Sequence, residues 1–175
     1  MTAHDRPFDT GRPRPIVTTL DTMRRRIDHD AFDAAVLSLD AVVVDLGYGD
    51  VRALPGAVAW IAHLRREGKR IAVVAGDERA GTALDLAGVA DRIDVVVTGW
   101  DARRRLARAL EELGVQPDRT IVMGVQPQDI EAARAAEVEL AIGVARGEAT
   151  PERLRRSGAV AVVADPQELL GPTSG

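Results

Sequence analysis

The chain has 175 residues, of which 46% are hydrophobic and 29% charged, and its formal net charge is -4. This length suits one α/β domain with a sizeable core and is too short for two comfortable domains. The absence of cysteine excludes disulfides, thiolate zinc sites and cysteine nucleophiles. Apolar runs fall far short of a membrane span of about 20 residues, and the first fifteen residues lack a signal-peptide core. We therefore expect a cytoplasmic protein that does not act at a membrane.

Positive charge is carried almost entirely by arginine, since Lys69 is the only lysine in the chain. Two arginine triplets, Arg24–Arg26 and Arg103–Arg105, fall on segments expected to be helical, where such a run is typical of a solvated face. We therefore expect both triplets to face solvent, and we do not predict a nucleic-acid-binding protein.

The N-terminal residues 1–17 are rich in proline and polar side chains, so we expect an arm that buries little surface. A short helix is expected from Thr19 to Asp28, with Thr18 or Thr19 as its cap. Residues 18–171 are expected to form a single domain, and residues 172–175 a short tail.

Buried strands and amphipathic helices are expected to alternate from Phe32 onward. The strands are expected at residues 34–39, 70–75, 93–99, 120–125, 140–145 and 159–165. The helices are expected at residues 54–68, 80–90, 101–114, 127–138 and 150–158. Continuous valine-rich strands between helices are typical of a mainly parallel sheet covered on both faces. The predicted fold class is therefore α/β, a doubly wound three-layer sandwich.

Ligands of such sheets bind beyond the carboxyl ends of the strands, so the residues that follow each strand are the candidates for a site. Neither a GxGxxG nor a GxxxxGK[ST] pattern opens any expected helix, which argues against dinucleotide and P-loop sites. The candidate positions are Ser38, Asp40, Ala75, Gly76, Asp77, Gly99, Trp100, Gly124, Val125 and Gln126.

Four segments in order resemble those of the haloacid dehalogenase-like (HAD) phosphatase superfamily, in its β-phosphoglucomutase-like branch. They read "FDAAVLSLDAVVVD", "LPGAVAWIAHLRREGKRIAVVAGDERA", "LEELGVQPDRTIVMGVQPQDIEAARAAEVELAIGV" and "LRRSGAVAVVADPQELL". The resemblance covers roughly residues 31–170 and implies a Rossmann-like core. Members of this branch carry a helical cap between the first two motifs, but here "DLGYGDVRA" is expected to pass almost directly from Asp45 to the helix at Leu54. We therefore expect a protein without a cap domain.

The first motif of that family implies an aspartate nucleophile and, two residues later, an aspartate general acid/base. In this sequence the nucleophile position holds Ser38, while the acid/base position keeps Asp40. Covalent phosphoryl transfer of this kind needs a carboxylate that also ligates Mg²⁺. An unactivated serine hydroxyl cannot replace it in both roles.

The second and third motifs have also lost the groups that the resemblance implies. Ala75 stands where a hydroxyl would bind phosphate, Gly76 follows it, and Asp77 would repel a phosphate. Trp100 stands in the place of the phosphate-neutralising lysine. Lys69 precedes a strand, so it is expected at the opposite edge of the sheet. We therefore expect that no cation is securely placed to meet a phosphate.

The fourth motif implies an acidic pair that holds Mg²⁺, and its positions hold Gly124 and Val125. A magnesium site needs carboxylates and waters in octahedral array. We predict no metal site, with Asp40 and Asp45, and Asp77 beside them, as the weak candidates that remain.

Joint loss at four loops favours a catalytically degenerate HAD-like protein, a pseudoenzyme with a binding, regulatory or scaffold role and no cofactor. A protein partner or a second copy of the chain would dock on the arm, on an exposed helix, or on the crevice with Tyr48 and Trp100. Two interpretations of Trp100 stay open. Its indole either anchors a partner or fills the emptied site as part of the core.

Two alternatives stay open for the function. One is a residual Mg²⁺-dependent phosphatase or phosphomutase-like hydrolase of a small phosphorylated metabolite, with Asp40 as general base and water as nucleophile. The other is a subunit that associates with a sugar-active enzyme, which only the resemblance to the β-phosphoglucomutase branch implies. Mg²⁺-dependent turnover that disappears in an Asp40→Asn variant would identify the hydrolase.

Overall fold

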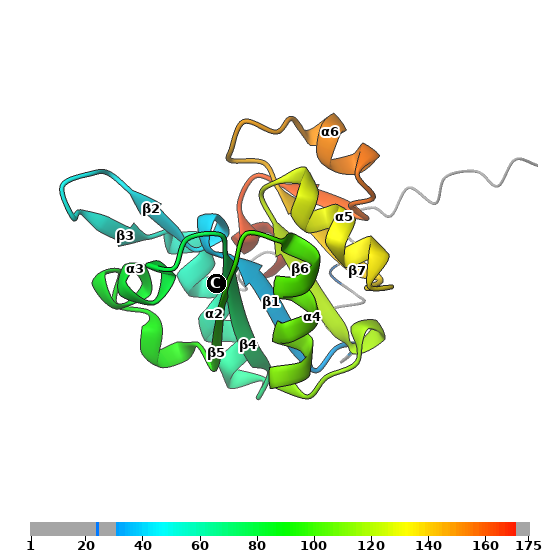
Figure 1. Ribbon diagram of the computed structural model, residues 1–175, viewed down its shortest axis with the longest axis horizontal. Coiled ribbons are helices and arrows are strands. Elements are labelled where there is room, and N and C mark those ends of the chain that lie inside the picture. The colour runs from blue at the N-terminus through cyan, green and yellow to red at the C-terminus, as the bar shows by residue number, and fades with distance from the viewer. Residues whose placement is uncertain (1–23, 25–30, 171–175) are drawn as a thin grey trace, which may run out of the picture.

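A computed structural model describes Arg24 and residues 31–170 of the chain. Its centre is a six-stranded sheet in which every neighbouring pair is parallel (Figure 1). In spatial order the strands are β5 (Val95–Thr98), β4 (Arg70–Ala75), β1 (Ala34–Ser38), β6 (Thr120–Gly124), β7 (Leu140–Val144) and β8 (Ala161–Val163). The predicted α/β sandwich with a parallel sheet is confirmed.

The central strands are built almost entirely from small and β-branched apolar residues. All residues of β1, β6 and β7 are buried, as expected for strands that are covered on both faces. The chain leaves β1 for β4 and β5 on one side and returns to β6 on the other side. This reversal places the switch point of the sheet, where α/β proteins bind ligands, at the carboxyl ends of β1 and β6.

Helices cover the two faces of the sheet, as Figure 1 shows. One face packs against α2 (Pro55–Arg66), α3 (Ala80–Leu86) and the 3₁₀ segment η4 (Pro166–Leu170). The other face packs against α4 (Ala102–Leu113), α5 (Pro127–Ala135) and α6 (Pro151–Arg156). Three shorter 3₁₀ turns connect elements: η1 (Leu39–Ala41), η2 (Ala90–Arg92) and η3 (Pro117–Arg119). The core therefore has two layers of aliphatic side chains, one on each side of the sheet.

The helix starts follow from local sequence. Pro55, Pro127 and Pro151 each open a helix, where proline's fixed φ fits and its missing N–H costs no hydrogen bond. The Thr150 side chain accepts a hydrogen bond from the Arg153 backbone N–H at 3.2 Å and so caps α6.

A small antiparallel hairpin, β2 (Val43–Asp45) with β3 (Val51–Ala53), stands apart from the main sheet, above α3 in Figure 1. We expected the chain to pass almost directly from Asp45 to the helix at Leu54, so the hairpin corrects that expectation. Its turn contains Tyr48 at φ 55°, flanked by two glycines that also have positive φ. Three-residue strands are too short to show a periodic pattern in the sequence.

The predicted N-terminal arm, residues 1–17, and the tail, residues 172–175, lie outside the described residues. Of the helix predicted from Thr19 to Asp28, only Arg24 is described; it is helical, and its Nε donates a hydrogen bond to the Glu168 carbonyl at 2.8 Å. Within the described ranges, every helix is too short or too polar to cross a lipid bilayer.

Candidate functional site

A crevice of about 320 Å³ opens at the carboxyl ends of β1 and β4, beside the start of α5. This is the edge at which ligand sites of parallel sheets occur. Seven of the positions singled out from the sequence line it, namely Ser38, Asp40, Ala75, Gly76, Asp77, Trp100 and Gln126. The fold therefore gathers residues from four separate loops around one opening, which we call the crevice.

Four polar side chains, Gln126 among them, line the crevice from helices or their starts: Arg105, Gln126, Gln128 and Asp129. Arg105 comes from the first turn of α4, and the other three come from the start of α5. We expected Arg103–Arg105 to face solvent and no cation to be securely placed to meet a phosphate. The first expectation is wrong for Arg105, whose side chain is only 11% exposed, whereas Arg103 and Arg104 are exposed as expected.

Ser38, Asp129 and Arg105 form one polar network on the crevice wall. The Ser38 hydroxyl donates to Asp129 Oδ2 at 2.7 Å. Arg105 Nη2 donates to the other carboxylate oxygen, Asp129 Oδ1, at 3.5 Å. Arg105 Nη1 also donates to the Gly99 carbonyl. The residue at the nucleophile position is thus a hydrogen-bond donor to an acid that is itself paired with arginine.

Local structure fixes Asp129 in this place. It is the third residue of α5, and its Oδ2 also accepts the Gln126 backbone N–H at 3.3 Å, as an acid in a first helical turn commonly does. Gly124 leaves the space that the carboxylate needs, because a Cβ at this position would lie 2.6 Å from Asp129 Cβ. The glycine therefore has a packing role rather than a metal-binding one.

Asp40 and Asp77 lie at the exposed rim of the crevice. The Asp40 carbonyl accepts a hydrogen bond from Arg146 Nη1 at 3.0 Å. The Asp77 carboxylate forms an ion pair with Arg79 Nη2 at 3.0 Å, and hydrogen bonds from Arg79 hold the pKa of that carboxyl below its usual value. An arginine therefore lies close to each of these two rim aspartates.

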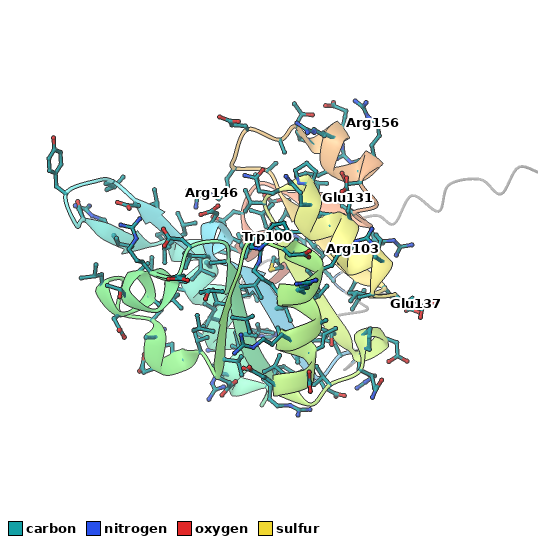
Figure 2. All side chains as sticks on the ribbon, in the orientation of Figure 1. Trp100, Arg103, Glu131, Glu137, Arg146 and Arg156 are labelled. Carbon is teal, nitrogen blue, oxygen red and sulfur yellow. The ribbon has the colours of Figure 1, made fainter. Side chains whose placement is uncertain are left out.

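Trp100 extends into solvent at the mouth of the crevice, where its residue is 86% exposed. Figure 2 shows it immediately before α4, at the end of the helix that faces the carboxyl edge of the sheet. Of the two interpretations of Trp100, the one in which the indole fills the emptied site as core is therefore wrong. The buried methyl group of Ala75 forms part of the crevice wall behind it.

Four candidate residues do not line the crevice. Gly99 is the first of them, and its carbonyl accepts the hydrogen bond from Arg105 Nη1. Gly124 packs against Asp129, and Val125 is buried in the core. Asp45 lies in the hairpin, where its Oδ1 accepts the Gly47 backbone N–H at 2.8 Å. This contact is the loop role that short acidic side chains commonly take. Asp45 instead lines a second hollow of about 360 Å³, between the hairpin and α3.

The donor set does not fit a magnesium ion. The described residues contain no group of three or more His, Cys, Asp or Glu side chains arranged to hold a metal. Asp129 is engaged by Ser38 and Arg105, and the positions of the family's acidic pair hold Gly124 and Val125. Mg²⁺ is commonly bound by one or two carboxylates and several waters in octahedral array, and the crevice lacks the acidic pair by which the family would supply those carboxylates.

Sequence reasoning missed Arg105 and Asp129, although each had a signal. Arg105 lies three residues after Ala102 and four before Ala109, so it borders the apolar stripe by which α4 packs on the sheet. Asp129 is an acid three residues after Gln126 in a helix opened by proline, a pattern that indicates a carboxylate turned back toward the helix start. In both cases the side chain points to the site from a helix, not from a strand end.

The family model described as haloacid dehalogenase-like hydrolase matches residues 12–137. Among curated proteins, a trehalose-phosphate phosphatase of Mycobacterium leprae is 32% identical over 149 residues. That alignment covers 82% of this chain but 33% of the relative, so the chain spans about a third of the relative's length.

Two solved structures illustrate the fold. A haloacid dehalogenase-like hydrolase of Streptococcus pneumoniae superimposes with a TM-score of 0.70 at 11% identity, covering 80% of this chain and 97% of the other. A β-phosphoglucomutase of Clostridium difficile has a TM-score of 0.66 at 14% identity, covering 79% and 93%. At such identities the likeness concerns the fold alone. The model match, with the fold and the order of the motifs, shows that the chain belongs to the haloacid dehalogenase-like hydrolase family.

Proposed function

We propose that this protein is a catalytically degenerate member of its family, which acts by binding and does not transfer phosphoryl groups. The observation that carries the proposal is the hydrogen bond from Ser38 to Asp129. Ser38 occupies the position of the aspartyl nucleophile at the end of β1. Its hydroxyl is directed to a carboxylate that is already paired with Arg105, and it presents no carboxylate to an incoming phosphate.

The rest of the crevice supports the same conclusion. Ala75 offers a methyl group where the family places a hydroxyl, and the available carboxylates do not form a magnesium site. Arg105 is the cation nearest the wall, but it is bound to Asp129 and to the Gly99 carbonyl. Phosphoryl transfer depends on charge stabilisation from all of these groups together, so their joint loss removes the main source of catalysis.

The curated relative suggests the setting in which such a protein would work. It is named as a trehalose-phosphate phosphatase, and this chain aligns with a third of it. We propose that the protein associates with an enzyme of sugar phosphate metabolism. It would do so as a protein partner, or by pairing with a domain of the same fold. Co-purification of this chain with such an enzyme would support the placement, whereas a chain that remains a lone monomer beside it would contradict it.

Phosphate release tests the proposal. The full chain is incubated with trehalose 6-phosphate, glucose 1-phosphate and p-nitrophenyl phosphate, with Mg²⁺ or with a chelator, beside an Asp40→Asn variant prepared in parallel. We expect no release that depends on Mg²⁺ or on Asp40. Release in the parent that is lost with chelator and in the variant would overturn the proposal and identify the residual hydrolase, with Asp40 as its base.

A further inference from the structure

The crevice keeps the features of a small-molecule site even though it lacks catalytic groups. Its volume of about 320 Å³ lies within the range of ligand pockets. Gln126 and Gln128 are exposed at its edge, and their side-chain amides can each donate and accept hydrogen bonds. Asp40 adds an exposed carboxylate that can accept two. Such a lining matches a ligand with several hydroxyl groups.

The charges at the crevice disfavour a phosphorylated ligand. Three carboxylates line it, against the single guanidinium of Arg105, which is bound to Asp129. Arg79 pairs with Asp77 outside the lining, and Arg146 donates to the Asp40 carbonyl. A phosphate dianion would have to displace one of these contacts and would lie close to at least one carboxylate. A neutral ligand would not need to displace an arginine contact and would not be repelled by the carboxylates.

Trp100 supplies the remaining element of recognition. Its indole is exposed at the mouth of the crevice, which Gln126, Gln128 and Asp40 also line. A pyranose ring has an apolar face of C–H groups and an equatorial belt of hydroxyls. The indole face can cover the C–H face of the sugar, and the amides and carboxylates can bind its hydroxyls.

We propose that the crevice binds a neutral saccharide of one or two rings, which stacks on Trp100 and bonds to Gln126, Gln128 and Asp40, with no bond made or broken. This inference rests on the proposed non-catalytic function and names its ligand class. It is the reverse of the phosphate ester preference that the fold would otherwise imply. The crevice would thereby bind a free sugar in preference to the phosphate ester of that sugar.

Isothermal titration calorimetry on the full chain tests the inference. The probes are glucose and trehalose, each beside its 6-phosphate, with inorganic phosphate as a further arm. We expect both neutral sugars to bind, and each 6-phosphate to bind at least about tenfold more weakly because of its charge. Trp100→Ala should weaken binding of the neutral sugars about three- to tenfold.

Gln128→Ala should also weaken binding. We expected Tyr48 at the crevice, but the structure places it in the hairpin turn, outside the lining, so Tyr48→Ala removes an exposed aromatic and should leave binding unchanged. Circular dichroism confirms that each variant is folded. Tighter binding of the 6-phosphates or of phosphate, an absence of sugar binding, or equal binding by parent and Trp100→Ala would each overturn the inference. Phosphate release measured on the same samples tests the proposed function separately, since sugar binding can fail while no release occurs.

Discussion

Ser38 and Asp129 lie 91 residues apart in the chain, yet the serine hydroxyl donates to the aspartate carboxylate at 2.7 Å. The bond joins the end of β1 to the first turn of α5 across the switch point of the sheet. The serine is 7% exposed, so its hydroxyl has little access to water as a substitute partner. Ser38 is therefore part of the hydrogen-bond network that joins the sheet to α5.

Ser38→Ala should lower the free energy of unfolding by about 1–2 kcal/mol, because Asp129 loses a donor in a partly buried site. Urea unfolding of Ser38→Ala, Asp129→Ala and the double variant gives the coupling energy between the two side chains. We expect a coupling of at least about 0.5 kcal/mol. Strictly additive effects would show that the two groups do not interact.

Asp129→Ala should lower the free energy of unfolding by about 2–3 kcal/mol, which is more than Ser38→Ala, because it also leaves the Arg105 guanidinium without its carboxylate. Glu131→Ala is the matched control, since Glu131 lies exposed on the same helix, as Figure 2 shows. The control should change stability by less than about 0.5 kcal/mol. Similar losses in the two variants would mean that the crevice network contributes no more than an exposed acid of α5.

Gly124→Ala and Gly81→Ala should have opposite effects. The new methyl group at position 124 would meet Asp129 Cβ at 2.6 Å, and the clash should cost about 1–3 kcal/mol. At position 81, within α3, an added Cβ meets no atom within 4 Å, so alanine should stabilise by up to about 1 kcal/mol. Thermal unfolding monitored by circular dichroism compares the stabilities of the two variants with that of the wild type. A stable Gly124→Ala variant would refute the packing role of this glycine.

Asp33 gives a prediction about pH. Arg119 hydrogen-bonds the Asp33 carboxylate at 2.9 and 3.2 Å and thereby lowers its pKa below the ordinary value of 3.8. The Asp33–Arg119 interaction therefore contributes fully to the free energy of unfolding above pH 3.8. This contribution is lost as the pH falls through the lowered pKa of Asp33 in the folded protein. Because both side chains are more than 40% exposed, it should be only about 0.2–1 kcal/mol.

The comparison of wild type with Asp33→Asn by urea unfolding, from neutral to acidic pH, checks this contribution. The difference between the two should be constant at neutral pH and should vanish at the acidic end. Asp118→Asn, an exposed change in the neighbouring η3 turn, should show little difference at either end. A gap between wild type and Asp33→Asn that widens on acidification would contradict the sign of the effect.

The alternation of strands and helices could be predicted from the sequence because long aliphatic runs and helix-opening prolines are local signals. The runs that became β4, β6 and β7 are examples, as are Pro55, Pro127 and Pro151. The β2–β3 hairpin could not be predicted in this way, because its pairing depends on two glycines in the turn and on contact with α3. Strands of three residues carry too few positions to show alternation.

The candidate site was predictable only where it lies directly after a strand. Ser38, Asp40 and Trp100 were found because the carboxyl ends of parallel strands meet at one edge. Arg105 and Asp129 reach the same crevice from helices, and the rotation of α4 and α5 on the sheet decides where those side chains point. That rotation results from tertiary packing, which a run of three arginines does not reveal.

The most direct test of the account is single-turnover phosphate release, with the protein in excess over trehalose 6-phosphate and Mg²⁺ present. Under this condition even one slow chemical event per molecule is detected, and it is compared with Asp40→Asn. The account predicts that the two proteins release the same background amount of phosphate. Release by the parent that exceeds the variant and stops on chelation of Mg²⁺ would contradict it and show that phosphoryl transfer persists at the end of β1.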